Sequence, residues 1–251
     1  QATILLFNEE RDAATQTMVQ PASSGGVMPE DYGDRVTGAV MAVPGGFFTY
    51  GDGGEGFTPN VTVDIEAVGA TSARVALWQD GYGDLTNVIF AEGPGTAGAP
   101  QLNVLFTADP GYVVDLYGFD LAGFGTDYVI AGVSVFAGAT TLFSVTDVLV
   151  EGNSTGPGHT SFAFDTPLSA VELLLQVDMS NLAAGIQDNI GLDSIQFGQT
   201  PPNVDPDPDP DPDPDPDPDP DPDPDNQVPE PGSLALLGLA LIALRRALGS
   251  R

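Results

Sequence analysis

The stretch "VTVDIEA" at residues 61–67 decides the fold class of this chain. Its valines and isoleucine alternate with polar residues, which is the period of a strand that buries one face. A second stretch, "TSFAFD" (160–165), puts Phe162 and Phe164 on the same face of another expected strand. A third, "AVELLLQVD" (170–178), places four apolar side chains on one face: Val171, Leu173, Leu175 and Val177. These stretches predict half-buried β-strands.

Short apolar runs of the same kind recur along residues 1–199, separated by Gly-rich turn signals such as "YGDGGEG" and "EGNSTGPG". Further strands are predicted at 3–7, 36–43, 73–78, 87–91, 102–107, 112–120, 128–136, 140–150 and 190–197. Helical periodicity is confined to short pieces around 9–18 and 179–186. The pattern predicts an all-β domain at 1–199, built as a β-sandwich or jelly roll.

The charge of the chain is strongly acidic, with a formal net charge of -30 and six Lys and Arg residues in total. Such a surface repels phosphate backbones, so nucleic acid is excluded as a partner. The same carboxylates offer hard oxygen ligands to calcium. The absence of cysteine excludes disulfides, cysteine-ligated metals and thiol catalysis.

Residues 200–227 form a low-complexity linker with ten Asp-Pro pairs between Asp205 and Pro224. Proline fixes φ and removes the amide donor, so neither helix nor sheet is expected in this disordered segment. Neighbouring aspartates repel one another and extend the chain further. At about 3.1 Å per residue, the repeat reaches roughly 60 Å. We interpret it as a spacer.

The segment 228–251 ends the chain with a short hydrophobic helix at residues 232–244, followed by Arg245 and Arg246. Thirteen helical residues span only about 20 Å, which is less than the roughly 30 Å hydrocarbon core. The arginine pair is expected to stay cytoplasmic, which leaves the acidic domain outside. Together these features predict a processed, transient membrane anchor rather than a lasting span, with a plain tail anchor as the alternative.

The sequence "VPEPGSLALLGLALIALRRA" resembles the PEP-CTERM sorting signal of Gram-negative bacteria. Its Pro-Glu-Pro triplet is Pro229, Glu230 and Pro231, and its basic cluster is Arg245 and Arg246. The resemblance implies recognition by exosortase and cleavage near the triplet. It also implies an exported protein at the cell surface or in the extracellular matrix, linked to exopolysaccharide. The start of the chain at Gln1 fits the removal of a signal peptide.

The remainder of the chain is similar to exported domains that precede this signal and that have no assigned activity. Five stretches carry the similarity: "PEDYGDRVTG" (29–38), "GFTPNVTV" (56–63), "GYGDLTNVIF" (81–90), "LYGFDLAGF" (116–124) and "DNIGLDSIQFGQ" (188–199). The last of them also resembles the closing strand of galactose-binding-like jelly rolls.

No residue pattern predicts an enzyme. His159, the single histidine, lies in the turn "GPGHTSF", and no "GxSxG" elbow accompanies it. A pair of carboxylates could hydrolyse glycosides, but no spacing singles one out. A glycan-modifying enzyme therefore remains a distant alternative to a non-enzymatic exported protein.

Calcium and glycan are the two candidate ligands. Asp193 shares strand parity with Ile195 and Phe197, so it is expected to point inward, where a carboxylate needs a partner. In galactose-binding-like folds such an acid helps hold a calcium ion beside the first strand. The acids that follow the first expected strand here are Glu9, Glu10 and Asp12. Binding of Asp193 by backbone amides, or an exposed bulge, is the alternative.

Five aromatic residues are candidates for stacking on sugar rings: Trp78, Tyr82, Tyr117, Phe124 and Tyr128. Tyr82 lies in a Gly-rich loop after Trp78, and we expect it to be the exposed one. A carbohydrate- or calcium-binding adhesion module is thus the main alternative to a purely structural role.

Overall fold

The alternation at residues 61–67 becomes strand β5 (Val61–Val68) in the computed structural model, with Val61, Val63 and Ile65 buried. The structure describes residues 2–7, 26–28, 30, 32–40, 47–50, 56–95, 97–153 and 156–201. The chain divides into two units, Gln1–Asn203 and Val204–Arg251, and every described residue belongs to the first. The predicted Asp-Pro linker, hydrophobic helix and sorting residues lie outside the described residues, apart from the first two positions of the linker.

The larger sheet has seven strands, in the order β12-β9-β14-β7-β6-β2, with β1 paired to β14. All of its pairings are antiparallel. Its strands are β1 (Ala2–Leu5), β2 (Gly26–Val27), β6 (Arg74–Trp78), β7 (Val88–Glu92), β9 (Val113–Gly123), β12 (Thr160–Ala170) and β14 (Ile190–Thr200).

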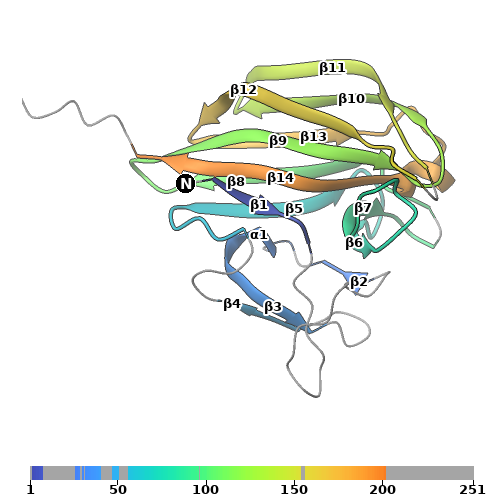
Figure 1. The fold of residues 1–251 in the computed structure, drawn as a ribbon, viewed down its shortest axis with the longest axis horizontal. Helices are drawn as coiled ribbons and strands as arrows, with labels where there is room; N and C mark the ends of the chain where they lie inside the picture. Colours follow the sequence, from blue (N-terminus) through green and yellow to red (C-terminus); the bar gives the residue numbers. More distant parts are fainter. Residues whose placement is uncertain are drawn as a thin grey trace, which may run out of the picture. The chain divides into compact units, whose positions relative to one another are not determined.

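The smaller sheet has five antiparallel strands, in the order β11-β10-β13-β8-β5. Besides β5 it contains β8 (Gln101–Ala108), β10 (Tyr128–Ala137), β11 (Thr140–Val150) and β13 (Glu172–Asp178). A separate hairpin joins β3 (Val36–Val40) to β4 (Phe47–Tyr50), and α1 (Tyr32–Arg35) precedes it. Figure 1 shows these elements along the chain.

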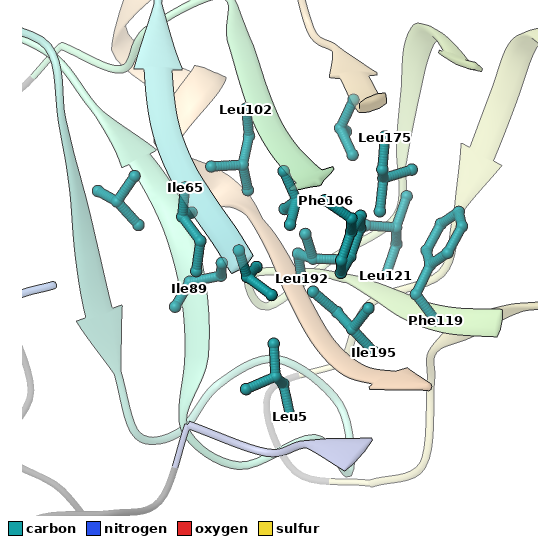
Figure 2. Close-up of a cluster of buried hydrophobic side chains, with 14 of the residues drawn as sticks. Leu5, Ile65, Ile89, Leu102, Phe106, Phe119, Leu121, Leu175, Leu192 and Ile195 are labelled. Carbon is teal, nitrogen blue, oxygen red and sulfur yellow. The ribbon is translucent and has the colours of Figure 1, made fainter. Parts of the chain in front are cut away.

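The two large sheets pack face to face, so the predicted β-sandwich is confirmed. The Phe106 ring on β8 meets the Phe197 ring on β14 with their centroids 5.0 Å apart. Figure 2 shows the apolar side chains that fill the space between the sheets. Residues with 1% or less of their surface exposed come from both sheets, among them Leu5, Ile65, Ile89, Leu102, Phe106, Leu121, Leu175, Leu192 and Ile195. Burying each such side chain contributes about 1.5–3 kcal/mol.

Most strand predictions agree with the structure to within a few residues, and the exceptions have local causes. The strand predicted at 160–165 runs on to Ala170 as β12, across a register shift between Ala163 and Leu168. Pro167 lies in that irregular stretch, and it is tolerated because β12 is an edge strand. Phe162 and Phe164 share a face as predicted, since both rings pack against Phe119.

One further expectation was wrong. Val171 was expected in the core but is 58% exposed, because β13 begins one residue later and Val171 lies where the chain leaves β12.

The helical elements agree only in part with the sequence. The helical piece expected at 179–186 is a 3₁₀ helix that begins later, η1 (Ala184–Asn189). Strands β2 and β4 and helix α1 were not predicted, and the helical piece expected at 9–18 lies outside the described residues. No helix in the described part of the chain has the length and apolar character to cross a membrane.

Candidate functional site

The outer face of the larger sheet is covered at one end by the loop that follows β6 (residues 79–87). Trp78 pairs with Val88 and Ala76 pairs with Phe90, so these side chains share the face opposite the main core. The loop covers them through a second apolar cluster made of Tyr82, Leu85, Val88 and Ala122, with Trp78 packed against it. This satellite cluster gives the loop a fixed place on the sheet.

The aromatic pocket lies at this cluster. It encloses about 200 Å³ and is lined by Trp78, Tyr82, Phe90, Phe124, Asp188 and Asn189. The Trp78 ring stands edge-on to Phe90 and Phe124, at centroid distances of 6.5 and 6.3 Å. Phe124 also contacts Tyr82 at 5.3 Å and remains 39% exposed. Four aromatic rings therefore surround a small hollow that has two polar side chains in its wall.

Tyr82 was expected to be exposed, and that expectation is wrong. The side chain is 3% exposed, and its hydroxyl donates a hydrogen bond to the backbone oxygen of Asp188 over 2.9 Å. Gly81 and Gly83, with φ of 84° and 63°, turn the loop back onto the sheet so that the ring between them faces inward. Burial, together with the negative charge of Asp188, raises the pKa of Tyr82, so the phenol stays neutral.

The polar wall of the pocket comes from the end of η1. Burial raises the pKa of the Asp188 carboxyl above its ordinary value, and the charge of Glu92 adds to this shift. The Asp188 Oδ1 and Trp78 Nε1 atoms are both buried, and neither has a hydrogen-bond partner among the described residues. Asn189 is held in place by donating to the Tyr128 hydroxyl over 2.8 Å. Two residues that line the pocket thus carry, within the described part of the chain, one unpaired buried acceptor and one unpaired buried donor.

Sequence reasoning found part of this pocket. Trp78, Tyr82 and Phe124 were candidates for sugar stacking, and the structure brings all three together. Phe90, Asp188 and Asn189 were missed as site residues. The only signal for the last two was their place in the stretch "DNIGLDSIQFGQ", because no periodicity predicts which residues of a turn face a pocket.

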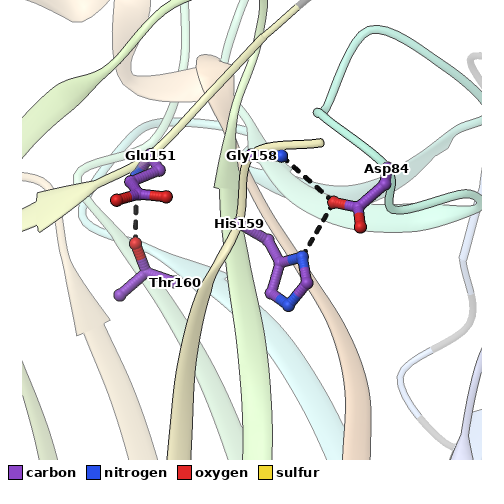
Figure 3. Close-up of polar contacts among 5 residues, drawn as sticks. All are labelled: Asp84, Glu151, Gly158, His159 and Thr160. Atoms are coloured by element: carbon purple, nitrogen blue, oxygen red, sulfur yellow. Dashed lines mark hydrogen bonds and ion pairs between the residues drawn. The ribbon is translucent and has the colours of Figure 1, made fainter. Parts of the chain in front are cut away.

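His159 ties the residues before β12 to the loop after β6. Its Nδ1 lies 2.8 Å from Asp84 Oδ1, and the same oxygen accepts a hydrogen bond from the Gly158 amide over 3.2 Å, as Figure 3 shows. The Gly83 amide adds a third link by donating to the Asn153 backbone oxygen over 2.8 Å. The Asp84 carboxylate raises the pKa of His159, and His159 in turn lowers the pKa of Asp84. This arrangement is a cross-link between two loops.

We expect this pair to make the free energy of unfolding depend on pH. The raised pKa of His159 gives stabilisation that is complete below the ordinary histidine value of about 6.5 and disappears as the pH rises through the raised pKa. The lowered pKa of Asp84 gives stabilisation that is complete above the ordinary aspartate value of about 3.9 and disappears as the pH falls through the lowered pKa. The pair therefore contributes most between about pH 4 and pH 6.5.

A double-mutant cycle with His159→Gln and Asp84→Asn measures this contribution by urea unfolding at about pH 5.5 and about pH 9. The two side chains are 32% and 46% exposed, so the coupling at the lower pH should be only ~0.2–1 kcal/mol. At the higher pH it should vanish. A coupling of equal size at both values would show that the contact does not depend on a charged histidine.

Asp193 is buried, at 4% exposure, but the expectation that it shares the core face of Ile195 and Phe197 is wrong. Its neighbour Leu192 lies in the main core, and the register of β14 against β9 shifts between Asp193 and Gln196 before Ile195 returns to that core, so Asp193 lies on the opposite face of the strand. The backbone amide of Ser194 donates to Asp193 Oδ1 over 2.6 Å. A backbone amide thus binds the carboxylate at a bulge, as the alternative to the calcium prediction proposed.

The calcium prediction itself is not tested, because Glu9, Glu10 and Asp12 lie outside the described residues. Within the part of the chain that is described, no group of three or more His, Cys, Asp or Glu side chains is arranged to hold a metal ion. The predicted sorting residues Pro229, Glu230, Pro231, Arg245 and Arg246 also lie outside the described part.

One part of the chain matches a known protein family. Residues 227–249 match the family model of the PEP-CTERM protein-sorting motif, which confirms the resemblance stated from the sequence. No curated protein sequence matches the chain.

Two solved structures align with part of this chain. The family 32 CBM from C. perfringens NanJ, in complex with galactose, aligns with 11% identity and a TM-score of 0.27, over 56% of this chain and 93% of its own. The enzymatically active domain of tailspike protein 4 from bacteriophage CBA120 aligns with 17% identity and a TM-score of 0.28, over 57% of this chain and 20% of its own. At these scores neither likeness carries an argument about ligand or activity.

Proposed function

Because this chain carries a PEP-CTERM protein-sorting motif at residues 227–249, we propose that it is a non-enzymatic protein exported by a Gram-negative bacterium. In this proposal exosortase recognises the motif and cuts the chain near the Pro-Glu-Pro triplet at 229–231. The β-sandwich then has a structural or interaction role at the cell surface or in the extracellular matrix, in association with exopolysaccharide.

The single observation that carries this proposal is the motif match. Its elements follow the order that sorting requires: the triplet, the apolar residues 232–244, and the pair Arg245 and Arg246. A helix of that length is too short for a lasting membrane span, and the arginines fix its orientation with their side toward the cytoplasm. The apolar segment therefore engages the inner membrane transiently while the chain is cut.

The acidic linker supports a function outside the membrane. From the sequence, repulsion between its aspartates is expected to extend this segment. In this proposal the linker is a spacer that keeps the folded domain clear of the lipid surface while the motif is engaged. The domain is then free to remain in the matrix after cleavage.

A non-catalytic role is supported by the position of the single histidine. His159 is engaged by Asp84 in a contact that joins two loops, so its hydrogen-bonding capacity on that side serves the fold. A glycan-modifying enzyme stays the distant alternative, and the release of reducing sugar from a polysaccharide by the purified protein would favour it.

The test of sorting is the intact mass of the protein recovered from the native host. We expect the secreted wild-type product to lack the apolar residues and the arginine pair. Replacing Pro229, Glu230 and Pro231 with alanines should leave those residues on the chain, because the triplet is what the processing enzyme reads.

Two further variants sharpen this measurement. Substitution of Pro201 and Pro202 with alanine changes two prolines near the sandwich, and processing should continue as in the wild type. Replacement of Arg245 and Arg246 with glutamine should reduce processing by weakening the orientation of the tail. A triplet variant that is cut like the wild type would refute the proposal.

A second candidate function, a carbohydrate-binding adhesion module, is favoured by the aromatic pocket. Sugar rings present flat apolar faces that pack against aromatic side chains, and Phe124 offers an exposed ring at this pocket. This function is compatible with sorting, because it concerns the sandwich and not the tail.

A further inference from the structure

We infer that the aromatic pocket binds one neutral pyranose ring of a glycan, with the sugar stacked on Phe124 and a hydroxyl group directed to Trp78 and Asp188. This inference names a ligand for the interaction role proposed above. It rests on the geometry of the sandwich, and it stands or falls without reference to how the tail is processed.

The stacking surface is Phe124, which follows the end of β9. The residue is 39% exposed, and its ring contacts the rings of Trp78 and Tyr82. Gly81 lies directly against the same ring, and a Cβ at this position would overlap it. Phe124 therefore combines a fixed position at the pocket with exposed aromatic surface, which suits the C–H face of a pyranose.

The polar complement comes from Trp78 and Asp188. An indole N–H only donates and a carboxylate only accepts, and both atoms lack partners among the described residues. A sugar hydroxyl can accept a hydrogen bond from the Trp78 N–H, and it can donate one to the Asp188 carboxylate. A hydroxyl group is therefore a suitable partner for either atom. Both atoms are shielded from solvent, so a hydroxyl reaches them only when side chains of the pocket wall move aside. Such rotamer changes are common when ligands bind.

Size and charge narrow the class of sugar. The pocket volume of about 200 Å³ lies below the ~300–1,000 Å³ of sites that enclose drug-sized ligands, so it holds one ring rather than an oligosaccharide. Asp188 lines the pocket, Glu92 adds negative charge nearby, and the chain carries a net charge of -30. An anionic sugar such as a uronate is repelled by this field, whereas a neutral hexose is not.

The chain provides its own reporter for this binding. Trp78 is the single tryptophan of the sequence, so the intrinsic tryptophan fluorescence comes entirely from the wall of the pocket. The experiment titrates the full 251-residue chain with D-glucose, D-galactose and D-mannose, and with D-glucuronate as the charged counterpart. We expect a saturable fluorescence change with at least one neutral hexose and none with glucuronate.

Variants assign the signal to the pocket. Phe124→Ala removes the stacking face, and Asp188→Ala removes the carboxylate that accepts from the sugar hydroxyl; each should weaken binding by at least about tenfold. Leu149→Ala is the matched control, since it removes an apolar side chain that is 51% exposed on β11, in the other sheet. Its affinity should equal that of the wild type, and thermal unfolding should show that all three variants are folded.

The outcomes are decisive. The absence of a saturable change with all three neutral hexoses would overturn the inference, as would equal binding of glucuronate. If Phe124→Ala loses its fold, Asp188→Ala alone decides, because a folded Asp188→Ala variant with wild-type affinity also overturns the inference. The intact-mass experiment on the tail is unaffected by any of these results, so a failure here is distinguishable from a failure of the sorting proposal.

Discussion

Replacement of Phe106 with alanine is expected to lower the free energy of unfolding by about 3–5 kcal/mol. Phe106 has no exposed surface, and its ring meets Phe197 across the space between the two sheets. Its removal loses the transfer free energy of the ring and leaves a cavity that the closely packed sheets fill only in part. Since domains of this kind are stable by about 5–15 kcal/mol, the loss is a large fraction of the total.

The measurement is denaturant unfolding followed by circular dichroism, with the Leu149→Ala variant beside it. Leu149 is also an apolar strand residue, but it is 51% exposed, so its truncation should change the stability by less than about 0.5 kcal/mol. Similar effects of the two substitutions would mean that the sheets do not share the core described here.

Replacement of Gly83 with alanine is expected to destabilise the protein by about 2–5 kcal/mol and to disturb the aromatic pocket. Two costs add. The φ of 63° places an L-residue in the left-handed region, which costs about 1–2 kcal/mol. A Cβ at this position would also overlap the backbone oxygen of Gly158, which cannot rotate away as a side chain can, so overpacking adds about 1–3 kcal/mol.

Gly138 separates these two costs. It lies in the turn between β10 and β11 with a φ of 56°, and a Cβ there would meet nothing within 4 Å. Gly138→Ala should therefore lose only the backbone part, about 1–2 kcal/mol. Denaturant unfolding gives both values, and Trp78 fluorescence should change for Gly83→Ala alone. Equal losses of unfolding free energy for the two variants would show that the close contact between Gly83 and Gly158 adds nothing to the cost of the substitution.

The sandwich was predictable from the sequence because its strands each bury one face. In β5 the alternation of Val61, Val63 and Ile65 with polar residues reports directly which side packs on the core. The alternation depends only on the local geometry of the strand, so it predicts the buried face even when the partner strands are unknown. Val171 shows its limit, because a pattern cannot say at which residue the chain changes from one sheet to the other.

The candidate site was less predictable because it depends on contacts between loops. Tyr82 looked exposed from its Gly-rich neighbours, yet those glycines are what allow the loop to fold back and bury the ring. Asp193 is buried but does not share the face of Ile195 and Phe197, because the register shift that follows it has no signature in alternation. Asp188 and Asn189 reach the pocket through the position of η1, which only the three-dimensional packing determines.

The placement of β14 constrains when the domain can fold. This strand, the last one described, lies between β9 and β7, and residues 195–198 of it pair with β1 at residues 2–5. The larger sheet therefore cannot close until nearly the whole of residues 1–200 is available, and contacts so distant along the polypeptide form slowly. In a nascent chain the larger sheet therefore stays incomplete until late in synthesis. For a chain that is exported as proposed above, this delay leaves most strands of that sheet free to pass through a narrow channel.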